Sequence, residues 1–564
     1  MERNDLFSSN IGIDSIGFYS PHLFLSLKEL ANARKINPKK YKFGLMANEM
    51  RIPNTFAGED SISLGLKAGY NAILRGNINP KEIDALFVGS ESYPYAVKSI
   101  SNIYKDLLGV SKNCFTQDVS NACAAASMAI LNAIAMIEAG IIKKALVIAV
   151  DISIYDLYSP GEPTQGAGAV ALILSRNPRI AIFSNTFGKV SANINDFFRP
   201  EGDRTAQVFS HYSVDAYLNF QIEAYDDLIS QTGEISADYY LFHAPYAKLP
   251  LKLMQKLIAE RWIGRIEDLI TQTSKKKIEF KEVPYFNDLD NDFLLSKDIK
   301  SKLDSKNFPK EKRKEIEEWI IRKIKNTSLP PLQVPALFGN MYSSAIWAEF
   351  MYLVENFAQV NDTIYFGSYG SGSTCISGLL KIQPNFKTVL SNPLNLKEYL
   401  DNKIQITVQE YEKLHENEIS SNLQWGKIVS SNKECAFSLN YCNEGCILSQ
   451  YNGLNYCPKG HSGSNLIEFP LTGTLTEIKP YSNDLSPLMD GFILIKNKPI
   501  IGSTMEFELR RWKTHKLDPP NSPKGLLNWM PIYRSVSSSP YLELVDNKIS
   551  SEIEEMASIS QIDL

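Results

Sequence analysis

Apolar and polar positions in the first third of the chain follow the periods of strands and amphipathic helices in turn. The apolar runs predict buried strands, and one-sided apolar spacing predicts helices. In order, these elements are strand Ile11–Tyr19, helix Ser61–Leu74, strand Ala85–Ser90, helix Val97–Leu108, strand Phe115–Val119 and strand Ala145–Ile152. The glycine-rich run Gly161–Leu174 leads into one more buried strand. This order predicts a layered α/β fold with a central sheet covered on both faces.

A second cycle of the same kind follows later in the chain. Its elements are strand Tyr239–His243, helix Lys248–Glu260, helix Tyr342–Asn356, strand Thr363–Ser368, a glycine turn and strand Thr374–Ile382. Two similar α/β halves indicate an internal duplication. The strand ends of both halves can then converge on one site.

Cys123 occupies the junction between strand Phe115–Val119 and a following helix that is apolar on every side. The free N–H groups and the dipole at the start of a helix favour a thiolate and offer a donor to an oxyanion. The alternative is that Cys123 is one more small core residue, because free cysteines are often buried.

Two further residues with catalytic chemistry follow strands in the same way, Glu91 and His243. A cysteine and a histidine can form an activating ion pair, and a carboxyl group in an apolar pocket can serve as a general acid or base. Each has a simpler interpretation, a structural histidine and a solvated glutamate. Their shared topological place, with glycine loops nearby, favours a common site.

Composition narrows the classes of function. The 564 residues, 44% of them hydrophobic, can bury a large core, and a net charge of -4 gives no case for nucleic acid. The N-terminal residues lack the pattern of a secretory signal, and every long apolar stretch is broken before it could span a membrane. Seven irregularly placed cysteines fit reduced thiols in a cytoplasm better than a disulfide framework.

Several ordered motifs resemble the 3-hydroxy-3-methylglutaryl-CoA synthases of the thiolase superfamily. They are IGIDSIGFYSP at the start, SES around Glu91, ACAAAS around Cys123, GEPTQGAGAVA from Gly161, DFFRP from Asp196, FHAPYAK from Phe242, GNMYSS from Gly339 and SYGSGS from Ser368. The resemblance implies a duplicated thiolase-like fold of two α/β halves, with helices between and outside two sheets. Residues 1–235 would form the first half and residues 236–451 the second. The family's last strands are expected in ITVQEYEKL from Ile406 and in AFSLNYCNEGCILSQY from Ala436.

The resemblance also implies an acyltransferase that joins acetyl-CoA to acetoacetyl-CoA, for the mevalonate pathway of isoprenoid biosynthesis. Cys123 would carry the acetyl group, Glu91 would move the methyl proton, His243 would polarise acetoacetyl-CoA and Asn340 would hold a carbonyl or orient water. Backbone N–H groups near Cys123 and in the Ser371 turn would form oxyanion holes.

Lesser roles come from the same motifs. Tyr246, Lys248 and Tyr342 would contact the substrate or the CoA arm, and Tyr342, Asp151 and Asp196 are expected just behind the reacting groups. The implied substrates are the two CoA thioesters, with no cofactor or metal required. The implied assembly is a cytoplasmic homodimer.

Related enzymes of the superfamily differ from this interpretation in the group that acts as the general base. Ketosynthases of the superfamily obtain their carbanion by decarboxylation and need no glutamate, and thiolases use a second cysteine as the base. Cys375, the candidate for such a cysteine, lies inside a predicted strand and is interpreted as core. Glu91 therefore selects the synthase.

Two alternatives of function stay open. The first is a polyketide β-branching synthase whose β-ketoacyl substrate is tethered to an acyl carrier protein. The second is a non-catalytic scaffold between a thiolase and a synthase, which would have no reason to keep Glu91, Cys123 and His243.

Three segments depart from the family. Ala124, Ala125 and Ala126 follow the cysteine, which leaves the lining of the thioester pocket open. A charged insertion covers residues 262–330, and its apolar Ile316, Trp319, Ile320 and Ile324 predict a surface helix packed on the core. A basic face of that helix is the alternative, for CoA phosphates or an acidic carrier.

The third departure is a tail, residues 452–564. The tail is expected to be a small β domain, with strands at Leu466–Leu475, Gly491–Ile495 and Ile500–Leu509. Its position after the family core suggests an oligonucleotide-binding-like (OB-like) fold. Cys442, Cys446, Cys457 and His461 have paired spacing, but a zinc site is disfavoured because zinc ribbons use shorter gaps.

Overall fold

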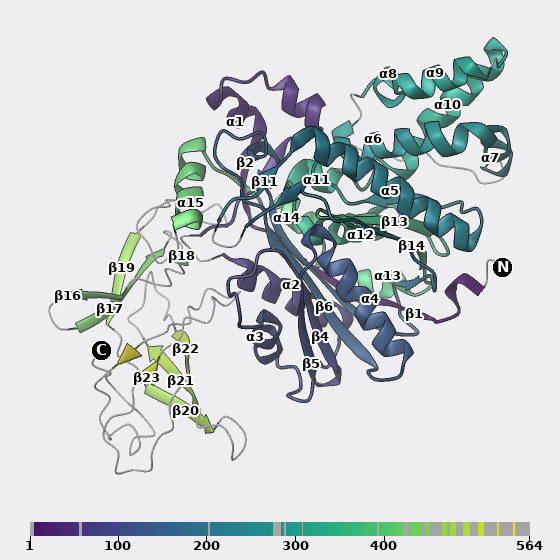
Figure 1. Ribbon diagram of the computed structural model, residues 1–564. Coiled ribbons are helices and arrows are strands. Elements are labelled where there is room, and N and C mark those ends of the chain that lie inside the picture. Colours follow the sequence, from purple (N-terminus) through teal and green to yellow (C-terminus); the bar gives the residue numbers. More distant parts are fainter. Residues whose placement is uncertain are drawn as a thin grey trace. The chain divides into compact units, whose positions relative to one another are not determined.

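A computed structural model describes residues 5–55, 59–200, 203–273, 284–286, 289–306, 308–391 and 394–420, followed by short strands between 428 and 546. The chain divides into two compact units. The first comprises Met1–Ile52, Leu64–Asp401 and Gln405–Val408, and the second comprises Pro53–Ser63, Asn402–Ile404 and Gln409–Leu564. The sheet and helices that carry the predicted site belong to the first unit (Figure 1).

A ten-stranded sheet forms the centre of the first unit, and its path runs β12-β13-β14-β8-β1-β7-β6-β4-β5, with β9 beside β14. The strands are β1 (Ile11–Tyr19), β4 (Ala85–Gly89), β5 (Phe115–Val119), β6 (Lys144–Ile152), β7 (Ala167–Arg176), β8 (Ala181–Phe183), β9 (Gly188–Ser191), β12 (Tyr239–Phe242), β13 (Thr363–Gly370) and β14 (Thr374–Ile382). Their order and bounds agree closely with the apolar runs of the sequence.

The same pairing pattern occurs twice in this sheet. β4 and β6 are parallel, and β7 and β1 continue from β6 in antiparallel pairs. β12 and β13 are likewise parallel, and β14 and β8 continue from β13 in antiparallel pairs. A short pairing between β1 and β8 joins the two groups. The predicted duplication is therefore present in the strand topology.

Helices cover both faces of the strands (Figure 1). Outside the insertion, the helices up to Asp401 are α1 (Leu27–Ala33), α2 (Ser61–Gly76), α3 (Ile100–Leu107), α4 (Ala125–Glu138), α5 (Ser210–Thr232), α6 (Lys248–Leu257), α11 (Gln333–Phe338), α12 (Ala345–Asn356), α13 (Phe386–Leu390) and α14 (Lys397–Asp401). Alternate residues of β4 explain the layering. Phe87 joins the large core that contains α4 and α12, whereas Leu86 and Val88 lie outside that core.

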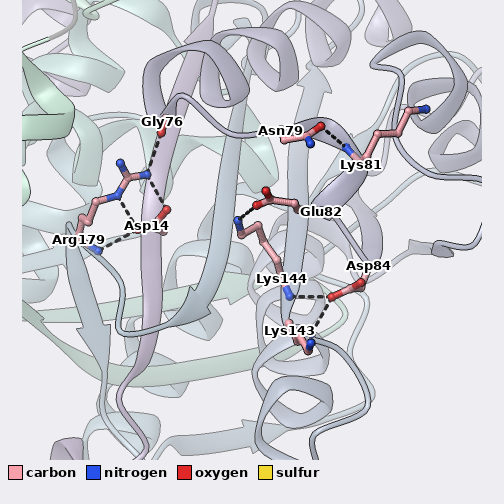
Figure 2. A network of polar contacts seen from close by, with 9 residues as sticks. All are labelled: Asp14, Gly76, Asn79, Lys81, Glu82, Asp84, Lys143, Lys144 and Arg179. Atoms are coloured by element: carbon pink, nitrogen blue, oxygen red, sulfur yellow. Dashed lines mark hydrogen bonds and ion pairs between the residues drawn. The ribbon is translucent and has the colours of Figure 1, made fainter.

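The ends of β4 and β6 opposite the site are tied by polar contacts (Figure 2). Arg179 binds both carboxylate oxygens of Asp14 on β1, at 2.7 and 2.6 Å, and also the carbonyl of Gly76. Asp84, just before β4, accepts a hydrogen bond from the backbone of Lys144 at the start of β6. Bidentate pairs of this kind fix direction as well as distance. The contacts of Asp84 join the starts of β4 and β6, the strands whose other ends lead to Glu91 and carry Asp151.

The described part of the insertion is helical. It contains α7 (Ile266–Thr273), α8 (Asn291–Leu294), α9 (Lys297–Ser305) and α10 (Lys310–Thr327). The four apolar residues predicted to pack, Ile316, Trp319, Ile320 and Ile324, are all buried, which confirms the packed surface helix. Arg313 pairs with Asp304 and Glu317, so acidic groups offset part of the basic charge of α10.

One predicted strand is wrong. The segment that begins at Ile406 was expected to form a final strand. It leads instead into helix α15 (Val408–Ser420). Val408, Tyr411 and Leu414 are buried at three-residue spacing, which is a helical period. The next expected pair is present as β17 (Glu434–Tyr441) and β18 (Ile447–Ser449).

The tail is described only through its strands. They are β19 (Asn465–Pro470), β20 (Thr474–Pro480), β21 (Met489–Lys496), β22 (Glu506–Trp512), β23 (Leu527–Asn528) and β24 (Val545–Asp546). β20, β21 and β22 form an antiparallel sheet. These strands bear out the β-rich character of the tail, while its OB-like fold and the domain boundaries stay predictions.

Candidate active site

Cys123 lies in a tight turn between β5 and α4. Ala122 has a φ of 42°, and the 3₁₀ turn Ala122–Ala124 leads directly into α4. The second half repeats this local geometry, because Tyr342 also has a φ of 42° and begins the 3₁₀ turn Tyr342–Ser344 before α12. Backbone strain of this type is typical of functional positions.

The alanine run after Cys123 has a packing explanation. Ala124, Ala125 and Ala126 are fully buried. A Cβ added to Gly89 of β4 would lie 2.3 Å from the Cα of Ala126, and one added to Gly370 of β13 would lie 2.7 Å from the N of Ala124. The two strands thus approach the backbone of this turn too closely for a side chain at Gly89 or Gly370, and small residues line the turn where they meet.

Aromatic side chains surround the thiol. Cys123 is 6% exposed and packs in a small cluster with Tyr155, Phe197 and Tyr342. The phenol groups of Tyr155 and Tyr342 are hydrogen-bonded to each other. Tyr155 and Phe197 were not singled out from the sequence, although Phe197 lies within the DFFRP motif. They supply the lining of the pocket that the sequence left open.

Glu91 is the hydrogen-bond partner of Cys123. The Cys123 Sγ donates to the Glu91 Oε1 at 3.1 Å. Burial, and then the charge of Asp151, raise the pKa of Glu91 to about 8. Burial and then the nearby Glu91 carboxyl raise the pKa of the Cys123 thiol well above its usual range. The predicted thiolate at a helix start is therefore wrong for the free site, because desolvation and carboxylates outweigh the helix dipole.

Asp151 lies at the end of β6 inside a cage of donors, fully buried. Its Oδ1 accepts from the Ser90 and Ser92 hydroxyls and from the N–H of Glu91, at 2.8 to 3.0 Å. Its Oδ2 accepts from the N–H and the hydroxyl of Ser343, which comes from the second half. Burial raises the pKa of Asp151 to about 6 against these hydrogen bonds. The carboxyl group fixes the backbone of Glu91 and adds negative charge beside it.

Arg199 is a site residue that the sequence did not single out. Its Nη2 donates to the carbonyl oxygen of Glu91 at 2.8 Å, and its charge slightly lowers the pKa of Glu91. Arg199 belongs to DFFRP, three residues after Asp196. The motif therefore held the signal, and only its first residue was assigned.

His243 follows β12 and is 1% exposed. The backbone N–H of His243 donates to the carbonyl oxygen of Gly367 at 2.9 Å, and the backbone carbonyl oxygen of His243 accepts from the Tyr217 hydroxyl at 2.7 Å. Burial lowers the pKa of His243 to about 3, so the imidazole is neutral at physiological pH. Cys123 and His243 form no ion pair within the described residues, because neither group is charged. The sequence suggested a pair of Cys123 with His243, whereas the hydrogen-bond partner of the thiol is Glu91.

Asn340 is placed by a glycine turn. Gly339 has a φ of 75°, and a Cβ there would lie 1.9 Å from the carbonyl oxygen of Gln165. The Asn340 Oδ1 accepts from the N–H of Tyr342 at 3.0 Å, and the residue is 2% exposed. The amide oxygen of Asn340 thus supports the turn at Tyr342, and its N–H₂ group is a hydrogen-bond donor.

Asp196 holds the glycine turn after β13. Its buried carboxylate accepts from the Tyr369 hydroxyl at 2.7 Å and from the N–H of Gly372 at 2.9 Å. Ser371, half-buried, lies in this turn. Because Gly370 approaches the Cys123 turn, the predicted Ser371 turn and Cys123 are brought to the same place.

Lys248 and Tyr246 lie at the start of α6, close to His243 in sequence. The Lys248 ammonium group donates to the carbonyl oxygen of Phe43 at 2.9 Å and lies 3.7 Å from the ring centre of Phe293. Burial and the charge of Lys252 lower the pKa of Lys248 to about 8. Tyr246 is half-buried.

The remaining candidate cysteines have other outcomes. Cys375 is fully buried in β14, and burial raises the pKa of its thiol far above the usual range, which confirms a core residue. The zinc candidates Cys442, Cys446, Cys457 and His461 lie outside the described residues. Within the described part of the chain, no cluster of ligating residues could hold a metal ion. The helices described there include none that could span a membrane.

The fold is that of the thiolase-like acyltransferases, and the site holds a buried thiol beside a carboxyl group. Two family models match the chain, the N-terminal part of hydroxymethylglutaryl-coenzyme A synthase over residues 7–178 and its C-terminal part over residues 183–424. The chain belongs to the hydroxymethylglutaryl-CoA synthase family, as its motifs predicted.

Known relatives support this assignment. The chain is 28% identical to a hydroxymethylglutaryl-CoA synthase of Gibberella zeae, an alignment that covers 74% of this chain and 91% of the relative. It is 35% identical to that of Archaeoglobus fulgidus over 44% of this chain and 72% of the relative.

Solved structures support the thiolase-like fold. MvaS in complex with 3-hydroxy-3-methylglutaryl coenzyme A has a TM-score of 0.61 at 24% identity, over 76% of this chain and 96% of MvaS. The curacin pathway HMG synthase has a TM-score of 0.57 at 21% identity, over 72% of this chain and 88% of that synthase.

Proposed function

We propose that this chain condenses acetyl-CoA with acetoacetyl-CoA to give 3-hydroxy-3-methylglutaryl-CoA and free CoA. The observation that carries the proposal is the hydrogen bond from the buried thiol of Cys123 to Glu91. It supports the proposal because a thiol can act as a nucleophile and an adjoining carboxyl group as its base, and both residues lie in the region that matches the family.

The first step is acetylation of Cys123. Ionised Glu91 takes the thiol proton, the sulfur attacks the carbonyl carbon of acetyl-CoA, and CoA leaves as a thiol that recovers this proton from Glu91. Backbone N–H groups at the start of α4 and in the Ser371 turn supply donors for the oxyanion. The aromatic cluster around Cys123 keeps the thioester away from bulk water.

The second step forms the new carbon–carbon bond. Glu91 removes a proton from the acetyl methyl group, and the resulting carbanion attacks the ketone carbon of acetoacetyl-CoA. Neutral His243 and the amide of Asn340 donate hydrogen bonds to carbonyl oxygens, and the new alkoxide takes a proton from Glu91. Water then hydrolyses the Cys123 thioester and releases the product.

Other residues position these groups. Asp151 and Asp196 hold the Glu91 backbone and the Ser371 turn, and Arg199 joins Asp151 in this role. Tyr342 lines the acetyl pocket. Tyr246 and Lys248 contact the CoA arm of a substrate. To do so, the ammonium group of Lys248 leaves the carbonyl oxygen of Phe43, to which it donates in the free chain. These steps need no cofactor.

The proposal includes a homodimer in the cytoplasm, serving isoprenoid supply. β5 ends the ten-stranded sheet, and Phe115 at its start is 57% exposed. An edge strand is suited to pairing with a second copy. Cys114, Cys123 and Cys375 are free thiols, as in a reducing compartment.

The test is acetyl labelling followed by condensation. Labelled acetyl-CoA should modify one thiol, the label should vanish in Cys123→Ala, and Cys375→Ala should keep it as the matched control. Label on Cys375 would refute the assignment. Glu91→Gln, which keeps the shape but not the base, should stop condensation. Turnover with acetoacetyl-CoA should exceed turnover with the same group on an acyl carrier protein, and the reverse ranking would contradict the CoA substrate.

A further inference from the structure

Two buried polar side chains of α5 reach the strand end that carries His243. Tyr217 and Gln221 lie one helical turn apart, so they project from the same face of α5, which packs on β13. Each of them is 1% exposed. Both donate hydrogen bonds to backbone carbonyl oxygens of the central sheet or of the residue that follows it.

His243 is the point where the pairing of β12 with β13 stops. The parallel register ends at Phe242, which lies opposite Gly367, and the backbone N–H of His243 donates to the carbonyl oxygen of Gly367 at 2.9 Å. The chain then turns toward α6, so the carbonyl oxygen of His243 has no strand partner among the described residues. It accepts from the Tyr217 hydroxyl instead, at 2.7 Å. Because a buried carbonyl without a partner is costly, this hydroxyl fixes the place where the strand ends.

Gln221 holds the other side of the same peptide segment. Its Nε2 donates at 3.0 Å to the Gly367 carbonyl oxygen, the atom that also accepts from the backbone N–H of His243. A Cβ on Gly367 would lie 2.3 Å from the Gln221 Oε1, so the amide lies directly on the strand backbone. The backbone of His243 is therefore fixed from α5 on both its N–H side and its carbonyl side.

The glutamine is not the residue that stability alone would favour here. The Oε1 of Gln221 is buried and has no hydrogen-bond partner among the described residues. A buried acceptor without a partner costs free energy, and the Gly367 carbonyl oxygen would keep the N–H of His243 if the amide were absent. An apolar side chain of the same length would fill the space without that cost. This imbalance indicates that Gln221 serves the site and not the fold.

We propose that Tyr217 and Gln221 are positioning residues that hold the backbone of His243 from α5 and so aim its imidazole at the ketone of acetoacetyl-CoA. The inference rests on the proposed role of His243 toward that substrate. Neither positioning residue touches a reacting atom in this scheme. Their effect is on condensation, and acetylation of Cys123, which needs Glu91 and not the histidine, should not depend on them.

The test compares Tyr217→Phe and Gln221→Met with a matched control in the full chain. The control is Tyr225→Phe, which also removes a buried hydroxyl of α5, one that accepts from the indole N–H of Trp262 at 3.3 Å. Enzyme acetylated beforehand on Cys123 is mixed with saturating acetoacetyl-CoA. We expect condensation to slow about tenfold in each of the first two variants, the effect of one lost hydrogen bond, with the rate of acetylation unchanged. The control should condense at the rate of the unsubstituted chain.

Two further readouts separate positioning from a structural role. In Cys123→Ala, which cannot be acetylated, acetoacetyl-CoA binds without reacting, and polarisation by the site should move the infrared band of its ketone to lower wavenumber. Adding Tyr217→Phe or Gln221→Met should reduce this shift, whereas adding Tyr225→Phe should leave it whole. In urea unfolding, Gln221→Met should be at least as stable as the unsubstituted chain, because it removes an unpaired buried acceptor.

Several outcomes would overturn the inference. A folded Tyr217→Phe chain that condenses at the normal rate is one, and a Tyr225→Phe chain that is equally slow is another. A fall in acetylation parallel to the fall in condensation would show a general loss of structure. If Tyr217→Phe does not fold, Gln221→Met decides, and an unshifted ketone band with an unchanged rate in that variant would refute the proposal. Failure of the proposed function is distinct, since it appears as missing acetylation of Cys123 in the unsubstituted chain.

Discussion

The pKa of Glu91 makes the condensation step strongly dependent on pH. Glu91 must be ionised to remove the methyl proton, and its pKa is about 8. The ionised fraction is then about 1% at pH 6 and about 50% at pH 8, so the rate should rise about 50-fold over that range and level off above it. His243, with a pKa of about 3, stays neutral throughout and should add no second transition.

The assay isolates this step from acetylation. Enzyme acetylated beforehand on Cys123 is mixed with acetoacetyl-CoA in single-turnover, rapid-quench experiments across the pH range. The acetyl thioester no longer carries a thiol proton, so the titration of Cys123 cannot contribute. Its hydrogen bond to Glu91, which lowers the pKa of Glu91, is lost as well, so the midpoint in this assay should lie at or above about pH 8. Deuterium exchange into the acetyl methyl group should follow the same curve, because it reports the proton removal alone. A rate that is flat between about pH 6 and about pH 9, or a midpoint near the ordinary pKa of a glutamate, would refute the reasoning.

Asp151→Asn is a second prediction on the same curve. The charge of Asp151 raises the pKa of Glu91, so the amide should move the midpoint of the condensation rate to lower pH. Asparagine keeps one oxygen to accept from the N–H of Glu91, but its N–H₂ group faces the N–H of Ser343. A circular dichroism spectrum that matches the unsubstituted chain is therefore the control for this variant. An unchanged midpoint would show that burial alone sets the pKa of Glu91.

Two packing predictions concern the scaffold. Gly370→Ala would place a Cβ 2.5 Å from the carbonyl oxygen of Asn121. The turn should be displaced, and acetylation of Cys123 in the labelling assay should fall about 100-fold. Gly44→Ala, which has open space around its Cβ, is the control and should leave acetylation unchanged. Arg75→Met would leave Glu355 buried without its ion-pair partner at 2.7 Å, which should cost about 3–5 kcal/mol in urea unfolding. Adding Glu355→Gln to Arg75→Met should recover part of that loss. An unfolding midpoint of Arg75→Met equal to that of the unsubstituted chain would show that the ion pair does not contribute to stability.

The sequence by itself determined the strands, the duplication and the place of the three main site residues. Apolar runs such as Ala145–Ile152 specify buried strands whatever surrounds them, because burying them is the dominant favourable free energy. Glu91, Cys123 and His243 each follow a strand, and strand ends are positions that a sequence pattern can predict. The helix at Val408 was missed because a short apolar spacing was interpreted with the period of a strand.

Only the tertiary structure decided the chemistry of those residues. The sequence suggested a thiolate at Cys123 and an ion pair with His243, whereas the folded site pairs a neutral thiol with Glu91 and keeps the histidine neutral. In each case the physical reason is desolvation, which depends on every element packed around a group and not on its neighbours along the chain.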